Sequence, residues 1–252
     1  MKHDAFETLS APASGSPVKH PAGYTRAPRL YTCEHASNRV PRPWRLRNSD
    51  RKLLSMHWGY DIGAANVTRA LVRLDPGSRA VLSRFSRLLI DPNREPADPT
   101  AVLVHTDEGS PTFNRHAHEA RVYAERVARF HTPFHAALAE AVAVEHRILI
   151  SIHSFTPVFR GVRRGMEAGV LFDEHDGLAM RLVDAMRAQG LRTEANAPYS
   201  GKDGLIYSAA RHGNAAGIPY LEIELRQDLI ASERSARAVA GRVARALDEA
   251  AL

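Results

Sequence analysis

The sequence of 252 residues contains one cysteine, Cys33, and no apolar run long enough to cross a bilayer, which takes roughly 18 residues. A single cysteine excludes an intrachain disulfide, and nothing in the cysteine content points to export. The N-terminus lacks the apolar core of a signal peptide. We therefore expect a cytoplasmic protein that does not partner with a membrane.

Runs of basic residues are absent as well. The formal charge is +6 and the pI is near 9.8, but the arginines are spread along amphipathic stretches and are not interleaved with aromatic residues. We therefore expect no nucleic-acid partner. A mildly positive field suits a small anionic substrate instead.

Short catalytic signatures are also missing. There is no HExxH metal motif, and no GxSxG elbow surrounds Ser37 or Ser154. Cys33 falls within an apolar segment and is expected to belong to the core.

Strand-like and helix-like segments alternate along most of the chain. Residues 1–27 are rich in Pro, Ser, Gly and Ala and predict a partly ordered leader, whereas residues 28–252 predict a single domain. The alternation predicts a three-layer α/β/α fold around a twisted, mixed and largely parallel sheet. The expected strands are 29–33, 80–82, 88–90, 148–152, 169–172 and 219–225. The expected helices begin near Asp50 and Asp61 and cover about 114–145 (with a break near Thr132-Pro133), 176–189 and 232–250; 160–165 and 196–217 are expected to be loops.

Two of the predicted strands are followed by a histidine. Ile148-Leu149-Ile150-Ser151-Ile152 leads into His153, and Arg29-Leu30-Tyr31-Thr32-Cys33 leads into Glu34-His35. In open α/β sheets, ligands bind beyond the carboxyl ends of central strands. Two strands that end in histidine therefore indicate one shared site.

Further polar residues lie at or near predicted strand ends. They are Asp61, the segment from Arg87 to Asp91-Pro92-Asn93-Arg94, and the group Glu222, Glu224 and Arg226. Two imidazoles and a carboxylate are typical ligands of a catalytic zinc, and a separate carboxylate can serve as general base. Arginine suits a substrate carboxylate, which it binds in a bidentate manner. These residue types favour a metal hydrolase.

Four blocks in order, CEHASNRVP, SRLLIDPNRE, ISIHSF and GNAAGIPYLEIELRQDLI, resemble the N-formylglutamate amidohydrolase family. The resemblance covers about residues 29 to 230. It implies a phosphorylase/hydrolase-like fold related to zinc carboxypeptidases and aspartoacylase-type enzymes, which cleave an N-acyl amide with zinc. It also implies one Zn²⁺ per chain, another divalent metal being the alternative.

The resemblance assigns roles to particular residues. His35 and His153 match the zinc-binding histidines, and Glu224 matches the general base. Asn93 and Arg94 match the substrate-holding element, and we assign Arg87 and Arg226 to substrate binding with them. Glu222 and Glu224 share one face of their strand, and spacing alone does not decide which is the base.

The third metal ligand is the point of departure. The wider group has a glutamate three residues after the first histidine, where this sequence has Asn38. Asp61 matches an aspartate of the formylglutamate family and is preferred over Glu34 and Asn38. His212 is a further candidate that either polarises the scissile carbonyl or is a solvated loop histidine.

We therefore expect a zinc-dependent amidohydrolase that removes an N-acyl group, formyl in the family, from an acidic amino acid such as N-formylglutamate in histidine degradation. The alternatives are a hydrolase of another N-acyl amino acid or small peptide, and a catalytically silent relative that binds an anionic metabolite. The sequence does not indicate the oligomeric state.

Overall fold

The computed structural model describes residues 5–11, 28–144, 146 and 148–252. Within these residues a central sheet has the strand order β1-β3-β2-β4-β9-β7-β8. The strands are β1 (Phe6–Ser10), β2 (Arg29–Cys33), β3 (Arg79–Ser83), β4 (Ile148–Phe155), β7 (Ala168–Leu171), β8 (Thr193–Ala195) and β9 (Tyr220–Arg226). Four neighbours, β3, β2, β4 and β9, are parallel. β1 pairs with β3 and β7 pairs with β9 in the antiparallel sense, so the sheet is mixed.

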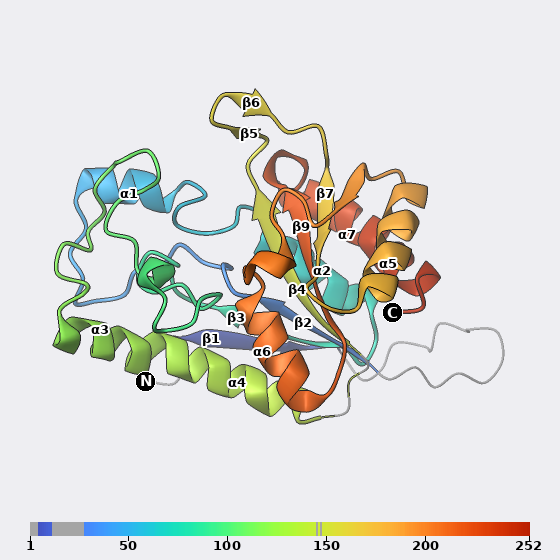
Figure 1. Ribbon diagram of the computed structural model, residues 1–252, viewed down its shortest axis with the longest axis horizontal. Helices are drawn as coiled ribbons and strands as arrows, with labels where there is room; N and C mark the ends of the chain where they lie inside the picture. The colour runs from blue at the N-terminus through green and yellow to red at the C-terminus, as the bar shows by residue number, and fades with distance from the viewer. Residues whose placement is uncertain (1–4, 12–27, 145, 147) are drawn as a thin grey trace.

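Helices cover both faces of this sheet (Figure 1). One layer consists of α2 (Ala64–Leu74), α5 (Asp176–Ala188) and α7 (Glu233–Glu249), and the other contains α4 (Thr132–Val142) and α6 (Tyr207–Ala216). Strand β4 shows why: Ile148, Ile150 and Ile152 pack toward the first layer, whereas Leu149 packs toward the second. Apolar residues on both faces require cover on both faces. The three-layer α/β/α prediction is confirmed.

The described part of the chain also contains several shorter elements. They are α1 (Asn48–Leu54), η2 (Pro99–Ala101), α3 (Ala120–Arg126), the π-helical η3 (Val127–His131), the hairpin β5 (Val158–Phe159) and β6 (Val162–Arg163), η4 (Gly201–Asp203) and η5 (Gln227–Leu229). None of the helices in the described residues has both the length and the apolar character needed to cross a bilayer.

Several boundaries differ from the sequence-based expectation. β4 continues through His153 to Phe155, so His153 lies within the strand rather than after it. Leu88-Leu89-Ile90 is not a strand. Its backbone turns, with Leu89 N–H donating to the Ser86 carbonyl, and its side chains are buried as part of a loop. An apolar run alone does not separate a buried loop from a strand.

The helical segments differ too. The predicted helix over 114–145 begins at Ala120, and near Pro133 it continues through the π-helical η3 without a break. The predicted loop 196–217 contains α6, and residues 160–163 of the predicted loop 160–165 belong to the β5–β6 hairpin. β1 falls in the predicted leader, of which residues 1–4 and 12–27 lie outside the described residues.

Candidate active site

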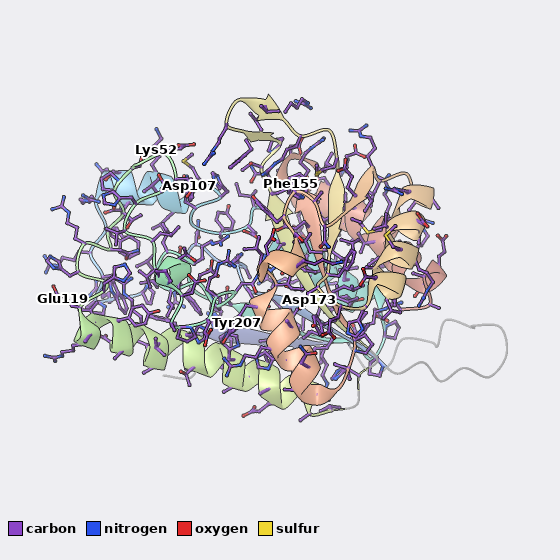
Figure 2. The ribbon with its side chains drawn as sticks, in the orientation of Figure 1. Lys52, Asp107, Glu119, Phe155, Asp173 and Tyr207 are labelled. Atoms are coloured by element: carbon purple, nitrogen blue, oxygen red, sulfur yellow. The ribbon has the colours of Figure 1, made fainter. Side chains whose placement is uncertain are left out.

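A cavity of about 440 Å³ opens at the carboxyl ends of β2 and β4, on the sheet face that carries α4 and α6. The sheet contributes His153, Phe155, Glu222 and Glu224, and loops contribute the opposite wall, which includes Trp58 and Asp107. Figure 2 labels Phe155 on the sheet and Asp107 on the loop across from it. The cavity therefore combines a buried polar floor with a partly apolar wall.

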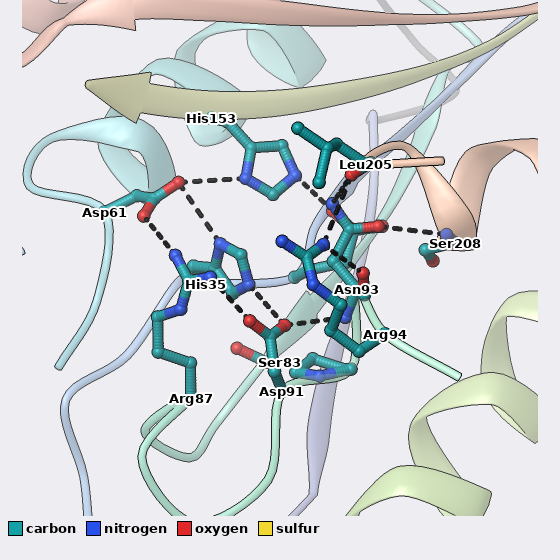
Figure 3. A network of polar contacts seen from close by, with 12 residues as sticks. His35, Asp61, Ser83, Arg87, Asp91, Asn93, Arg94, His153, Leu205 and Ser208 are labelled. Atoms are coloured by element: carbon teal, nitrogen blue, oxygen red, sulfur yellow. Dashed lines mark hydrogen bonds and ion pairs between the residues drawn. The ribbon is translucent and has the colours of Figure 1, made fainter. Parts of the chain in front are cut away.

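Three predicted residues meet at this floor (Figure 3). Asp61 Oδ2 lies 3.3 Å from His35 Nδ1 and 2.9 Å from His153 Nδ1, and all three side chains are buried. The loop that carries Asp61 is fixed to both neighbouring strands: Asp61 N–H donates to the His35 carbonyl, and Ser154 N–H donates to Asp61 Oδ2. Both imidazoles thus present Nδ1 to one carboxylate oxygen.

The other ring nitrogen of each histidine faces a second carboxylate. His35 Nε2 lies 2.7 Å from Asp91 Oδ1, and His153 Nε2 lies 3.1 Å from Glu34 Oε2. Metal-binding histidines commonly donate their second N–H to a carboxylate, which fixes the tautomer and the ring orientation. Glu34 also accepts hydrogen bonds from Thr32 and Ser151, so its oxygens are fully engaged behind His153. Glu34 therefore engages the ring nitrogen of His153 that does not face Asp61.

The electrostatics of this floor favour a cation. Burial disfavours the charged form of His153, but the carboxylates of Glu222, Asp61 and Glu34 outweigh it and raise its pKa well above the usual range. Burial likewise opposes ionisation of Asp61, yet the two histidines hold its pKa well below the usual range. Buried carboxylates gathered around two histidines are stabilised by a positive charge placed between them.

The donor set fits a divalent metal. The ligand atoms of His35, Asp61 and His153 all lie within 4.8 Å of one another. Tetrahedral zinc with bonds near 2.0–2.1 Å places neighbouring ligand atoms about 3.3 Å apart. The Nδ1–Oδ2 distances of 3.3 and 2.9 Å are close to that spacing. His35, Asp61 and His153 could therefore hold a metal, whereas Asn38 is exposed to solvent.

Glu222 and Glu224 lie next to this group on β9. In the strand pairing Glu224 is opposite His153 and Glu222 is opposite Ser151. Burial raises the pKa of Glu222 to about 7 and that of Glu224 to about 8. Glu222 Oε2 accepts a hydrogen bond from Asn93 Nδ2, whereas Glu224 Oε2 is buried without a hydrogen-bond partner among the described residues. Glu224 thus lines the cavity and carries a buried oxygen with no hydrogen-bond partner in the described part of the chain.

The Asp91-Pro92-Asn93-Arg94 segment forms a further wall. Arg87 pairs with Asp91 at 2.5 Å and lies 3.6 Å from Asp61, so it ties the two carboxylates together. Asn93 Oδ1 accepts the N–H of Ser208 in the first turn of α6, and its Nδ2 donates to Glu222 and to a backbone carbonyl. Arg94 Nη1 donates to the Asn93 carbonyl, and in the described part of the chain no carboxylate pairs with Arg94. Arg94 is accordingly the lining cation best placed to receive an anion.

Two predicted site residues lie elsewhere. Arg226 does not line the cavity; its guanidinium donates to Asp228 and to the carbonyls of Arg164 and Met166. His212 lies on α6, not in a solvated loop, and it is not part of the cavity lining. The structure thus places neither residue in the cavity lining.

His212 instead belongs to a buried group of histidines behind the cavity wall. His135 Nε2 donates to the Pro92 carbonyl, so in the neutral ring its Nδ1 accepts from His212 Nε2 at 2.8 Å. His131 Nε2 donates to the Arg94 carbonyl. Burial lowers the pKa of His135 to about 3 and that of His212 to about 4. His131 and His135 thus hydrogen-bond to backbone carbonyls of the 91–94 segment, and His212 supports His135.

Sequence reasoning placed Asp91 only within a substrate-holding element and treated Glu34 only as a possible ligand. The pairing of each with a histidine depends on where three chain segments meet, and no spacing in the sequence encodes it. One signal was available: Glu34 and Asp91 are the carboxylates next to the two motifs that supplied His35 and Asn93.

The family comparison agrees with this geometry. The model of the N-formylglutamate amidohydrolase family matches residues 27–231. The chain belongs to this family. Its members are hydrolases that act on amide bonds, and so is this protein.

Solved structures show the same fold. A gene product of Agrobacterium tumefaciens is 31% identical, with 99% of this chain and 96% of that one covered and a TM-score of 0.80. An N-formylglutamate amidohydrolase from Ralstonia eutropha is 19% identical, with 98% of both chains covered and a TM-score of 0.72. The cell-shape determinant Csd4 of Helicobacter pylori is 12% identical over 96% of this chain and 54% of that one, with a TM-score of 0.50. No curated protein sequence gives a significant match.

Proposed function

We propose that this family member is a zinc-dependent amidohydrolase that removes an N-acyl group, formyl in the first instance, from an acidic amino acid such as N-formylglutamate. One observation carries the proposal. Two histidines direct Nδ1 at one aspartate oxygen, while Asp91 and Glu34 engage both second nitrogens. Such doubly supported imidazoles are typical of metal centres.

His35, Asp61 and His153 would hold the ion. When bound, zinc supplies Lewis acidity toward a water molecule and an amide carbonyl. Burial of the site in a low-dielectric cavity strengthens every charge interaction within it. Glu34 and Asp91 keep the histidine rings in the orientation that presents Nδ1.

Glu224 is the general base in this proposal. Glu224 lines the cavity opposite His153 in the strand pairing, and its Oε2 has no hydrogen-bond partner among the described residues. This carboxylate can accept a proton from the attacking water and pass it to the departing amine. Glu222 is restrained by Asn93 and shapes the field around Glu224. The pKa of about 8 in the metal-free protein falls when a cation lies nearby, which leaves Glu224 ionised at neutral pH.

The arginines divide the remaining tasks. Arg94 has no carboxylate partner among the described residues and can bind the substrate carboxylate next to the scissile amide. Arg87 fixes Asp61 and Asp91 and, being about a quarter exposed, also offers charge to the developing oxyanion. Asn93 positions Glu222 and α6 more than it contacts the substrate.

The test combines metal analysis of protein purified without chelator with an assay of formate release from N-formylglutamate. We expect zinc near one equivalent per chain, and turnover that is lost with the metal in His153→Ala. Glu224→Gln should retain zinc and lose kcat by about 10²- to 10⁴-fold, whereas Glu222→Gln should lose less. Metal-free protein that zinc does not activate would exclude this function.

A second substrate class is favoured by the apolar wall of the cavity, which includes Trp58, Phe155, Phe159 and Leu171. This wall leaves room for an acyl group larger than formyl. Parallel assays with N-acetylglutamate and N-succinylglutamate test it. Turnover of these compounds without formate release would keep the hydrolase and change the acyl group.

A further inference from the structure

The hairpin β5–β6 contributes Phe159 to the cavity lining, and neither it nor the residues that follow it have a role in the chemistry above. The hairpin stands away from the sheet beyond the end of β4 (Figure 1). It exposes Val158, Phe159 and Val162, and Phe159 also lines the cavity. Directly after the hairpin comes Arg164, which is only partly exposed.

Arg164 contacts residues of the cavity wall. Its guanidinium carbon lies 4.8 Å from the ring centre of Phe159 and 5.4 Å from those of Phe155 and Tyr199. Its Nη1 donates to the carbonyl and the hydroxyl of Thr156, each at 3.2 Å. These four neighbours all line the cavity. No carboxylate within the described ranges forms an ion pair with Arg164, so its charge is balanced only by rings and neutral oxygens.

Tyr199 completes this arrangement. Its hydroxyl oxygen accepts from Arg164 Nη2 at 3.3 Å, which leaves the hydroxyl hydrogen free to donate. Burial raises the pKa of Tyr199, the charge of Glu224 raises it further, and Arg164 and Arg87 oppose the rise. The phenol therefore lies within electrostatic reach of the proposed base as well as of Arg164.

Arg87 and Arg94, which line the cavity, differ from Arg164, which is not itself part of the lining but contacts four lining residues. Arg87 is committed to Asp61 and Asp91, and Arg94 lies on the 91–94 segment. An N-acyl acidic amino acid carries two carboxylates, one beside the scissile amide and one at the end of its side chain. A cavity that selects such a substrate needs a second cationic point away from the first.

We propose that Arg164 and Tyr199 form this second point and bind the side-chain carboxylate of the substrate, while Arg94 binds the carboxylate beside the amide. The inference rests on the proposed function and adds the residues that distinguish acidic from neutral amino acids. The aromatic rings hold the guanidinium against residues that line the cavity and keep it partly desolvated, which strengthens its interaction with an anion.

The experiment compares N-formyl-L-glutamate with N-formyl-L-glutamine, which has the same shape without the side-chain charge. Arg164→Met should lower kcat/KM for the glutamate compound by about 10- to 100-fold, mainly through KM, and leave the glutamine compound within about threefold. Tyr199→Phe should act in the same direction with a smaller effect. Arg164→Lys, which keeps the charge, should recover part of the preference.

Arg163→Met is the matched control, because Arg163 is an exposed arginine on the same hairpin. It should leave both substrates unchanged. An equal loss of kcat/KM for the two substrates in Arg164→Met would show a purely structural role and overturn the inference. No loss of kcat/KM for either substrate would overturn it as well. If the wild-type protein hydrolyses neither these substrates nor their N-acetyl and N-succinyl counterparts, the proposed function fails and the inference falls with it. Wild-type turnover with an unchanged ratio in Arg164→Met removes the inference alone.

Discussion

Glu34 Oε2 lies 3.1 Å from His153 Nε2, and the same carboxylate accepts the Ser151 hydroxyl at 2.6 Å. Burial opposes ionisation of Glu34, but the hydrogen bonds from His153 and Ser151 outweigh it and lower its pKa to about 2. Glu34 therefore remains an acceptor well below neutral pH. Without metal, His153 has a raised pKa and donates from Nδ1 to Asp61 as well as from Nε2 to Glu34. In the neutral form that a metal ligand takes, Glu34 would keep the one proton on Nε2 and leave Nδ1 for the ion.

Replacing Glu34 by Gln should weaken zinc binding by about 10- to 100-fold, because a neutral amide oxygen is a weaker acceptor than the carboxylate that fixes the tautomer of His153. Competition with a chromophoric chelator measures the zinc Kd directly and does not depend on turnover. Glu194→Gln, which changes an exposed glutamate on β8, is the control. An unaltered Kd in Glu34→Gln would mean that Ser151 and the strand backbone suffice to orient the ring.

His212→Leu should cost stability rather than catalysis. The change leaves His135 Nδ1 as a buried acceptor without its donor, a loss of about 1–3 kcal/mol in the free energy of unfolding. We expect kcat to stay within about tenfold of wild type, in contrast to the loss in Glu224→Gln. A kcat loss as large as that of Glu224→Gln would restore His212 to the catalytic group.

The difference in the free energy of unfolding between wild type and His212→Leu should depend on pH. Burial lowers the pKa of His212 to about 4, so between about pH 6.5 and 4 the unfolded chain takes up a proton that the folded chain does not. The contribution of this histidine is thus present above pH 6.5 and is lost as the pH falls. The stability gap between wild type and His212→Leu should narrow from pH 8 to pH 4.5 in urea unfolding.

The parts of the fold set by local pattern could be predicted from the sequence. The β-branched run before His153 and the apolar stripe of α2 encode a buried strand and an amphipathic helix through their own periodicity. Helix α6 could not be predicted in this way, because it is held by tertiary contacts such as the Asn93 bond to the N–H of Ser208.

The candidate site likewise combines residues that local sequence pattern predicts with residues whose place depends on tertiary contacts. His35 and His153 follow from strand-end position, but the contact of Asp61 with both depends on a loop that packs against two strands. Gly63 permits this packing, since a Cβ there would lie 2.3 Å from the Ile230 carbonyl oxygen. Arg226 shows the converse. It follows Glu224 by two residues, which suggests a place in the site, yet its guanidinium donates to carbonyls of the segment before β7. Arg164 fills the corresponding role in our proposal from a different segment.

Gly169→Ala should destabilise the protein and disturb the substrate wall together. A Cβ at Gly169 would lie 1.8 Å from the carbonyl oxygen of Ala197, two residues before Tyr199. Overpacking of this kind costs about 1–3 kcal/mol and should lower Tm by several degrees. Gly177→Ala, where a Cβ meets open space in helix α5, is the control and should not lower Tm. Equal melting curves for Gly169→Ala and wild type would show that the 197–199 segment moves aside freely.

Glu224 also makes the stability of the metal-free protein depend on pH. Burial raises its pKa to about 8, so from about pH 4.5 upward the folded chain keeps a proton that the unfolded chain has released. The stabilising contribution is therefore complete at pH 4.5 and is lost as the pH rises through 8.

Glu224→Gln cannot ionise. In the presence of chelator its free energy of unfolding should match that of wild type near pH 5 and exceed it by at least about 1.4 kcal/mol at pH 9. Urea unfolding at pH 5, 7 and 9 measures this gap, and zinc should close it, because a cation beside Glu224 stabilises the carboxylate that the metal-free site disfavours. A gap that does not change with pH would show that Glu224 is ionised in the folded protein without metal, and the electrostatic argument for a cation at this floor would then rest on the histidines and Asp61 alone.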